Sequence, residues 1–290
     1  MLNYKLFETK KCVYSFEIFP PKQNTSFEAV TKVIKELEVL APDFISVTYG
    51  AGGSVRDNRT VELCKLIKQT TNMEPVAHLT CMGASKQEIE SLLSQLMQIG
   101  VKNILALRGD KNPLTISNGE FLHASDLITF IKAKYGNTFD ICGACYPTGH
   151  NESETQKEDI INLKRKVECG AQHLVTQLFF DNNEYYKFLE LIDIADINVP
   201  VQAGIMPLTN KRQIERLISM SGATLPAKLA KLISRFGDNG EAMRDAGIAY
   251  ATEQIIDLIA NGARGIHLYT MNNAYVATKI TQNIKTMLEV

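Results

Sequence analysis

The chain has 290 residues, of which 45% are hydrophobic, so it can bury a large core as one large domain or two smaller ones. Its formal net charge of −1 argues against a surface built as a whole to bind nucleic acid or an anionic membrane. The first residues lack the layout of a secretory signal, and no apolar run approaches the roughly 20 residues of a membrane-spanning helix, so we expect a cytoplasmic protein.

The first predicted element is a strand over Val13–Phe19, which is apolar except for Ser15 and Glu17 and stops at Pro20. Its β-branched and aromatic residues favour a buried strand, and a proline cannot continue the ladder, so Glu17 lies near a strand's C-terminal end. Burial of an unpartnered carboxylate raises its pKa, and an acid that stays protonated near neutral pH can act as a general acid. A structural role, as an ion pair or as a polar residue at a strand end, is an equally good interpretation of Glu17 alone.

Seven more short apolar runs follow, each succeeded by polar or glycine-rich residues and then a segment of helical periodicity. They are Phe44–Tyr49, Val76–Thr80, Ile104–Leu107, Ile141–Tyr146, His173–Phe179, Val201–Ile205 and Gly265–Tyr269. Capping boxes are predicted at Thr25–Glu28 and Ser85–Glu88, and helix ends at Gly100 and Gly170. The interval after the seventh run is long, and three extra helices are expected over Lys211–Ser221, Pro226–Arg235 and Glu241–Ala260.

Eight alternating units in a chain slightly longer than the roughly 250 residues typical of the class predict a (β/α)8 TIM barrel of the α/β class. We expect a single catalytic domain over residues 1–290, with the extra helices between strands 7 and 8. The chief alternative, a doubly wound open sheet, usually carries a GxGxxG turn after its first strand, and none follows Phe19.

The six cysteines are scattered and are expected to be free thiols, because a chain of this size needs no disulfide staples. Cys142 and Cys145 have redox-motif spacing, but they lie in a predicted strand, whereas a thioredoxin-type pair opens a helix. We therefore expect small core residues there. No second cysteine pair or close histidine pair completes a metal site in the sequence, so no metal is expected.

Polar side chains recur where the predicted strands end, which is where a barrel of this class places its active site. They are Glu17, Thr48, Tyr49, His78, Thr80, Arg108, Asp110, Tyr146, His150, Gln177 and Tyr269 to Asn273. Their convergence on one rim favours an enzyme or a ligand-binding protein. The helix after the fifth strand carries the basic run Lys164–Lys166, and its Asp159, Asn162 and Lys166 share one side. Such a run is usually a solvated face; the sharper interpretation is a phosphate site for a cofactor, formed by Arg165 and Lys166.

Taken together, the ordered motifs resemble methylenetetrahydrofolate reductase over nearly the whole chain. The motifs are Ser15 to Pro21, Ser46 to Ala51, His78 to Cys81, Ala106 to Asp110, Ala124 to Leu127, Asn162 to Lys166, Thr176 to Asp181 and His267 to Asn272. The resemblance implies a (β/α)8 barrel that reduces 5,10-methylenetetrahydrofolate to 5-methyltetrahydrofolate, with FAD as cofactor and NADH or NADPH as co-substrate. Both substrates would use one flavin face in turn, which gives ping-pong kinetics through flavin N5.

The resemblance also assigns roles. Glu17 would be the general acid that protonates N10 of the folate, Thr48 would lie near nicotinamide and flavin, and Asp110 would contact flavin and pterin. Gln177 would contact folate or nicotinamide, and Gln213 looks like a further folate contact. The FAD contacts implied are Thr48, Tyr49, Ala51, His78, Arg108, Gly109, Asp110, Ala124, Tyr146, His150, Asp159, Asn162, Arg165 and Lys166. Asp110 is also expected to influence the charge of Glu17, because neighbouring carboxylates raise one pKa.

Three positions depart from the family pattern. His123 replaces a tyrosine common in bacterial relatives, Leu217 an aromatic residue expected over the nicotinamide or pterin, and Asn273 an arginine at the folate end. The chain ends near the barrel, so feedback by S-adenosylmethionine is not expected. The sequence leaves open the choice between NADH and NADPH, polyglutamate preference, a partner subunit, and whether the chain forms a homo-oligomer. Two other functions also stay open: a flavin-free pterin-binding one-carbon transferase, and a non-catalytic subunit of a folate enzyme.

Overall fold

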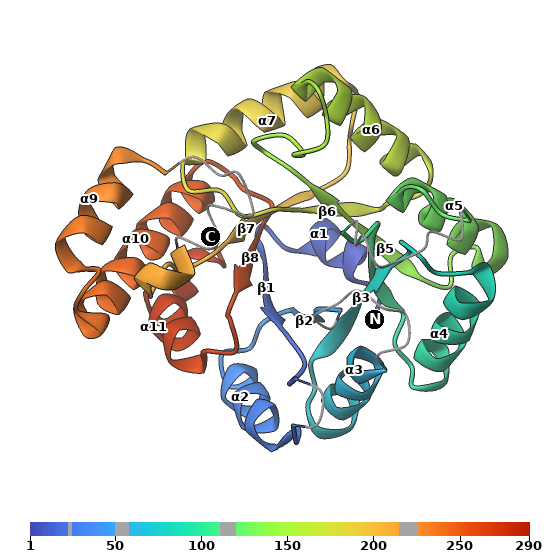
Figure 1. Ribbon diagram of the computed structural model, residues 1–290, viewed down its shortest axis with the longest axis horizontal. Helices are drawn as coiled ribbons and strands as arrows, with labels where there is room; N and C mark the ends of the chain where they lie inside the picture. Colours follow the sequence, from blue (N-terminus) through green and yellow to red (C-terminus); the bar gives the residue numbers. More distant parts are fainter. Residues whose placement is uncertain (23–24, 50–57, 111–119, 215–224) are drawn as a thin grey trace.

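Eight parallel strands close into a barrel in the computed structural model, in the order β1 to β8, so that β1 pairs with both β2 and β8 (Figure 1). The structure describes residues 1–22, 25–49, 58–110, 120–214 and 225–290. The strands are β1 (Val13–Ile18), β2 (Phe44–Val47), β3 (Glu74–Thr80), β4 (Asn103–Leu107), β5 (Asp140–Cys145), β6 (His173–Thr176), β7 (Val201–Ile205) and β8 (Gly265–Tyr269). The predicted (β/α)8 fold is therefore confirmed, and the single domain over 1–290 stays a prediction.

Helices surround the barrel, as Figure 1 shows. Their bounds are η1 (Asn3–Lys5), α1 (Leu6–Thr9), α2 (Glu28–Glu38), α3 (Arg59–Thr70), α4 (Lys86–Gln98), α5 (Ala124–Tyr135), α6 (Gln156–Glu168), α7 (Asn182–Ile194), α9 (Ala227–Phe236), α10 (Gly240–Ala260), α11 (Ala274–Ile284) and η2 (Lys285–Met287). The extra helices predicted before β8 are confirmed as α9 and α10. Of the third, residues 211–214 are helical and the remainder lies outside the described residues.

Local signals in the sequence set most helix ends. The capping box at Ser85 is confirmed, because its side chain accepts from the Glu88 N–H while the Glu88 carboxylate accepts from the Ser85 N–H. Gly100 and Gly170 follow α4 and α6 with φ of 76° and 120°, a conformation that favours glycine at a helix end.

The capping box predicted at Thr25 is wrong, because α2 begins at Glu28 without a side-chain cap. The Arg59 guanidinium instead binds the carbonyl oxygens of Pro21, Lys22 and Thr25 and holds this segment as a loop. In place of the predicted cap, Thr25 thus contacts Arg59, the first residue of α3, which lies 34 residues further along the chain.

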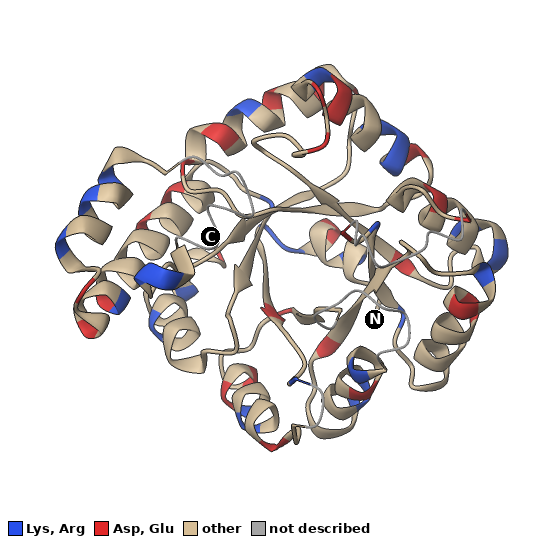
Figure 2. Ribbon diagram, viewed as in Figure 1, with Lys and Arg blue, Asp and Glu red and all other residues tan. Residues whose placement is uncertain are grey.

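Charged residues lie mostly on the helices, where both signs are interspersed, and the strands are nearly free of them (Figure 2). Among the described residues, none of the helices is both long and apolar enough to cross a lipid bilayer. All six cysteines are free, as predicted. Cys142 packs inside the barrel and Cys145 packs between strand and helices, because positions three apart on a strand face opposite sides.

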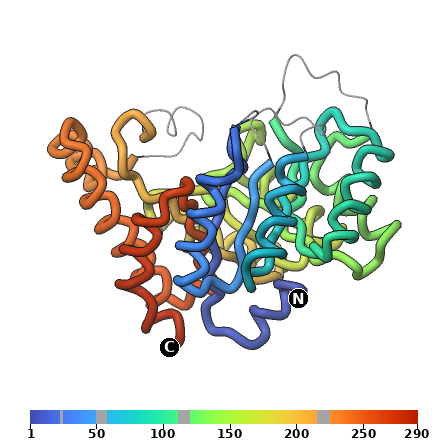
Figure 3. Tube along the Cα trace, turned by 90° about the horizontal axis from the view of Figure 1, so that it is seen from below, coloured from blue at the N-terminus to red at the C-terminus, as the bar shows by residue number. Residues whose placement is uncertain are grey.

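The N-terminal segment closes the bottom of the barrel, at the end opposite the C-terminal ends of the strands (Figure 3). The Tyr4 N–H donates to Asp140 Oδ2 at 2.9 Å, and the Asn3 N–H donates to Asn103 Oδ1 at 3.0 Å. Asp140 also pairs with His173, whose Nε2 lies 3.4 Å from Oδ2, and both side chains are almost fully buried. The N-terminal segment thus covers the lower end of the barrel.

Candidate active site

A cavity of about 520 Å³ lies at the C-terminal ends of the strands and is called here the inner cavity. It is lined by Glu17, Thr48, Tyr49, His78, Thr80, Leu105, Leu107, Arg108, Gly109, Asp110, Ala144, Tyr146, His150, Val175, Thr176, Gln177 and Tyr269. These residues come from seven strands or the loops that follow them. They include the convergent polar residues that the sequence placed on this rim, except those of the predicted segment after Tyr269, from Thr270 to Asn273.

Glu17 stands between two histidines at the floor of the inner cavity. Its Oε2 lies 3.5 Å from Nε2 of His78 and 3.5 Å from Nε2 of His267. Barrel closure produces this arrangement, because Glu17 is in register with Ser46 on β2 and with Tyr269 on β8. The Glu17 side chain keeps 19% exposure and can therefore still meet a ligand in the cavity.

The expected rise of the Glu17 pKa is wrong in this structure. Burial, the largest influence, does raise the pKa of Glu17, but the hydrogen bond with His267, the electrostatic influence of the two adjacent imidazoles and the hydrogen bond with Ser46 outweigh it. The net effect lowers the pKa, so Glu17 is a carboxylate at neutral pH. Asp110 lines the same cavity but is not among the groups that shift Glu17.

A buried chain of hydrogen bonds beneath Glu17 determines which ring nitrogen of the neutral His267 imidazole carries the hydrogen. Gln202 Nε2 lies 3.4 Å from the Val13 carbonyl oxygen, and because a carbonyl oxygen can only accept, this atom is the amide nitrogen. The same nitrogen donates to Ser15 Oγ at 3.0 Å. Ser15 Oγ lies 2.7 Å from His267 Nδ1. With its oxygen accepting from Gln202, the Ser15 hydroxyl satisfies its own hydrogen by donating to Nδ1. The neutral imidazole then carries its hydrogen on Nε2, which faces Glu17 and lies 3.4 Å from Ser46 Oγ.

Two buried polar atoms in the inner cavity have no hydrogen-bond partner within the described part of the chain: His78 Nε2 and Thr80 Oγ1. Burial lowers the pKa of His78 to about 4, so its imidazole is neutral. Beside them, Gly109 has a φ of 86°, and a Cβ there would lie 3.2 Å from the Thr80 Cβ. The glycine lets a ligand approach the backbone, and the two side-chain atoms offer it hydrogen bonds.

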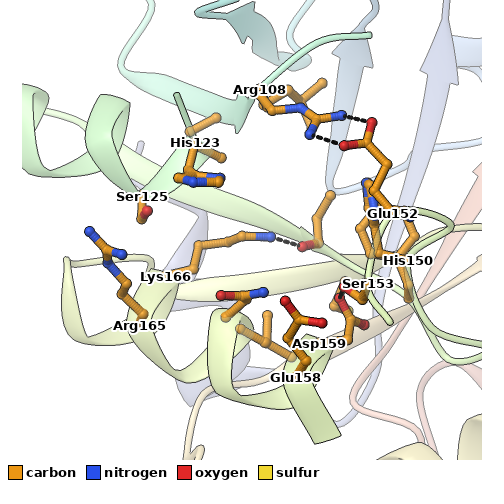
Figure 4. Close-up of a pocket in the computed structure, with 18 residues that line it drawn as sticks. Arg108, His123, Ser125, His150, Glu152, Ser153, Glu158, Asp159, Arg165 and Lys166 are labelled. Atoms are coloured by element: carbon orange, nitrogen blue, oxygen red, sulfur yellow. Dashed lines mark hydrogen bonds and ion pairs between the residues drawn. The ribbon is translucent and has the colours of Figure 1, made fainter. Parts of the chain in front are cut away.

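A second cavity, of about 210 Å³ and called here the outer cavity, lies between β4, β5, α5 and α6 (Figure 4). It is lined by Ala106, Leu107, Arg108, His123, Ala124, Ser125, Ala144, Cys145, Tyr146, His150, Glu152, Ser153, Glu158, Asp159, Asn162, Leu163, Arg165 and Lys166. The Lys164–Lys166 run is therefore not merely a solvated face, because Arg165 and Lys166 line this cavity together with Asp159 and Asn162.

The charged groups of the outer cavity are held by specific contacts. Arg108 forms a bidentate ion pair with Glu152, and Lys166 Nζ donates to the Ala144 carbonyl (Figure 4). Burial lowers the pKa of Lys166 and raises that of Asp159, whose Oδ1 lies 3.4 Å from Ser153 Oγ. The cavity thus presents cations and hydrogen-bond donors in a partly dry setting, where both act more strongly on an anion than in water.

The two cavities share Leu107, Arg108, Ala144, Tyr146 and His150 and so adjoin along one trough. The rings of Tyr146 and His150 meet edge to face at 4.7 Å. His150 Nδ1 accepts from the Glu152 N–H, so the neutral ring can donate only through Nε2. A long ligand with a reactive ring at one end and anionic groups at the other fits such a trough.

Some predicted residues are not placed by either cavity. Ala51 and Leu217 lie outside the described residues, and Gln213 lines neither cavity, so their roles stay predictions. Of the other family departures, His123 lines the outer cavity, and the Asn273 side chain accepts from the Val276 N–H as the N-cap of α11.

Sequence reasoning missed His267, Gln202 and Glu152. His267 carries a usable signal, because a histidine two positions before Tyr269 faces the same side of a strand, as Ser15 does two positions before Glu17. Glu152 carries no such signal, since it sits in a loop and its role depends on the fold bringing it to Arg108.

The methylenetetrahydrofolate reductase family model matches residues 3–285. The chain is 35% identical over 284 residues to the 5,10-methylenetetrahydrofolate reductase of Escherichia coli K12, which covers 98% of this chain and 94% of the relative. It is 34% identical to methylenetetrahydrofolate reductase (NADH) 1 of Arabidopsis thaliana, covering 96% of this chain and 49% of that protein. A solved structure with 13% identity and a TM-score of 0.72, covering 99% of each chain, shares the fold; it is a Clostridium thermocellum protein that binds two copies of 5-methyl-5,6,7,8-tetrahydrofolic acid.

Proposed function

The chain belongs to the methylenetetrahydrofolate reductase family, and on that premise we propose that it reduces 5,10-methylenetetrahydrofolate to 5-methyltetrahydrofolate with NADH or NADPH, through bound FAD. The observation that carries the proposal is the joined pair of cavities. The half-buried acid Glu17 lies at one end, with two polar atoms that make no hydrogen bond among the described residues, and Arg165 and Lys166 lie at the other. This polarity suits a dinucleotide whose reactive ring enters the barrel mouth while its phosphates and adenosine stay outside.

The residues present fit FAD. In the inner cavity, His78, Thr80 and Gly109 would hold the polar edge of a flat ring. The buried His78 Nε2 and Thr80 Oγ1 make no hydrogen bond within the described part of the chain, and the glycine leaves room for the ring. In the outer cavity, Arg165 and Lys166 would meet phosphate or ribose oxygens. When bound, FAD would supply a site that accepts hydride from the nicotinamide and then passes it to the folate, in two separate half-reactions.

Glu17 would act in the folate half-reaction as the proton donor to N10. As the bond between N10 and the one-carbon unit breaks, its electron pair takes the proton, and the methylene group left on N5 accepts the hydride to become a methyl group. A carboxylate with a lowered pKa must first gain that proton. Folate binding would supply the cause, because it would remove water from the 19% of the side chain that is still exposed and so raise the pKa of Glu17.

Thr48, Asp110 and Gln177 complete the rim around Glu17 and would position the substrates. The Gln177 Oε1 accepts from the Leu178 N–H at 2.9 Å, which leaves the amide nitrogen of its exposed side chain for a ligand. Asp110, also exposed at the mouth of the inner cavity, could accept from the amino groups of a pterin.

The decisive experiment is anaerobic spectroscopy of the purified protein loaded with FAD. We expect a flavin spectrum that NADH or NADPH bleaches, followed by reoxidation on addition of methylenetetrahydrofolate. A protein that binds no flavin yet binds folate would instead support the flavin-free transferase. If the flavin binds but neither nicotinamide bleaches it, the reductase assignment fails.

The Glu17→Gln variant separates the half-reactions. We expect bleaching by the nicotinamide at the wild-type rate, and reoxidation by folate slowed by about 10²- to 10⁴-fold, the usual contribution of a general acid. Glu74→Gln is the matched control, because Glu74 opens β3 at the opposite end of the barrel and lines neither cavity. Equal loss of both half-reactions in Glu17→Gln would mean that Glu17 has a structural role only.

A further inference from the structure

The ion pair between Arg108 and Glu152 lies where the inner and outer cavities meet (Figure 4). Arg108 Nη1 donates to Oε2 at 2.8 Å and Nη2 donates to Oε1 at 2.6 Å, while Nε donates to the Gly109 carbonyl at 3.1 Å. The end-on fork is therefore occupied by a carboxylate. That fork is also the geometry by which arginine binds phosphate oxygens.

The other two cations of the outer cavity are held differently. Arg165 is 62% exposed and reaches Asp126 only at 3.8 Å, and Lys166 donates to a backbone carbonyl. A phosphate can approach either of them without displacing a closely bound carboxylate. Among the described residues that line the outer cavity, Arg108 is thus the cation for which an arriving anion must compete directly with an acid of the protein.

The segment that carries Glu152 is held by bonds of its own. The Glu152 N–H donates to His150 Nδ1 at 3.1 Å, the Ser153 N–H donates to the His150 carbonyl at 2.9 Å, and Gly149 turns the chain with a φ of 86°. These contacts involve the backbone and the His150 ring, so they do not depend on the Glu152 carboxylate. Replacing the carboxylate by an amide should leave the segment in place.

Charge is balanced among the described acidic and basic side chains, Asp, Glu, Lys and Arg, that line the outer cavity. Its three cations are Arg108, Arg165 and Lys166, and its three acids are Glu152, Glu158 and Asp159. Burial keeps His150 neutral by lowering its pKa. A diphosphate entering the cavity therefore meets no net positive charge, and its closest repulsion comes from the acid that already occupies an arginine fork. Removing that one charge leaves an excess of one cation.

We propose that Glu152 is an internal counter-anion that competes with the diphosphate of FAD for Arg108 and so weakens the binding of the cofactor. This inference rests on the proposed function, because it requires FAD to occupy the outer cavity. Glu152 would hold the guanidinium in place while the cofactor is away and would yield part of the fork when the phosphates arrive. The carboxylate thereby sets the affinity for FAD and touches no reacting atom.

The test is a titration of the flavin-free protein with FAD, followed by flavin fluorescence and by calorimetry. Loss of one competing hydrogen-bonded charge should lower the Kd of Glu152→Gln on the order of tenfold. The variant should also show a steeper loss of affinity as salt rises, because its cavity carries an excess positive charge. Riboflavin, which has no phosphate, should bind both proteins equally.

Glu154→Gln is the matched control. Glu154 is exposed, lies on the same segment, and its contact with Glu158 is made by its backbone N–H, so the variant removes one charge without touching Arg108. Its affinity for FAD should equal that of the wild type. If Glu152→Gln binds FAD no more tightly than Glu154→Gln, or more weakly, then Glu152 does not compete and the inference is overturned. A wild-type protein that binds no FAD would instead refute the proposed function itself.

Discussion

Replacing Gln202 by leucine should change the acid–base behaviour of Glu17 although the two side chains do not touch. Gln202 is 1% exposed, and its Nε2 donates to Ser15 Oγ at 3.0 Å. This bond turns the Ser15 hydroxyl hydrogen toward His267 Nδ1 and keeps the imidazole hydrogen on Nε2, facing Glu17. Leucine has a similar size but cannot donate, so Ser15 becomes free to accept from Nδ1 instead.

The size of the effect follows from the bond that is lost. One hydrogen bond of this kind contributes about 0.5–1.5 kcal/mol, which corresponds to a bias of about 2- to 12-fold between the two imidazole tautomers. A hydrogen on Nε2 stabilises the Glu17 carboxylate, whereas a bare Nε2 can accept from the protonated acid. Losing the bias therefore raises the pKa of Glu17, and at alkaline pH the protonated fraction grows by up to the same factor.

The assay is the rate at which methylenetetrahydrofolate reoxidises the reduced flavin, measured across pH. We expect the alkaline limb of the profile to move to higher pH in Gln202→Leu, while bleaching by the nicotinamide keeps its wild-type profile. Nitrogen-15 NMR of the His267 ring should show the hydrogen shared between Nδ1 and Nε2. The control is Gln254→Leu, which loses a comparable buried bond, from Nε2 to the Phe179 carbonyl at 3.1 Å, outside this chain of hydrogen bonds.

The result that would refute this reasoning is a Gln202→Leu profile that superimposes on those of the wild type and Gln254→Leu, with only the free energy of unfolding reduced. Gln202 would then be a packing residue, and the tautomer of His267 would be set by other groups.

Two further predictions concern the ends of the barrel. Asp140→Asn should lower the free energy of unfolding by about 3–5 kcal/mol, because it breaks a buried pair with His173. Burial lowers the pKa of His173, but Cys142 and Asp140 raise it by more than burial lowers it, to about 10. The pair therefore contributes its full stabilisation to the folded protein below pH 6.5. In urea titrations, the difference in the free energy of unfolding between wild type and Asp140→Asn should shrink as pH rises toward 10. Gly109→Ala should weaken FAD binding and lower the free energy of unfolding by about 1–3 kcal/mol, because φ is 86° and the new Cβ would crowd Thr80. Flavin titration and melting curves that match those of the wild type would contradict this prediction.

The eight strands and their order could be predicted from the sequence because each strand reads as a compact run of β-branched and apolar residues between turn signals. Their ends could not. The predicted strand over His173–Phe179 stops at Thr176, since the ladder lasts only while the neighbouring strand offers partners, and β7 pairs with β6 only at Leu174 and Val175. Strand length is thus a property of two segments, and one segment read alone overstates it.

The rim residues of the candidate site could be predicted for the same local reason, because a parallel barrel gathers the C-terminal ends of its strands. Contacts between segments that are distant in sequence could not be predicted from the sequence. Glu152 meets Arg108 across 44 residues, and Gln202 meets Ser15 across 187. The residues adjacent to Glu152 and Gln202 in the sequence give no sign of these roles, because the contacts with Arg108 and Ser15 form only when the barrel closes.

Glu17 combines a position that depends on one segment with a charge that depends on several. Its place could be predicted from one strand, but its charge depends on the strands beside it. A barrel of eight strands makes the first and the last neighbours, so the inward positions of Val13–Ile18 and Gly265–Tyr269 must face the same interior. A histidine at position 267 then stands beside the acid and holds its pKa down. An acid in an apolar strand therefore indicates a site, and the residues on the closing strand decide whether it waits there as a proton donor or as a carboxylate.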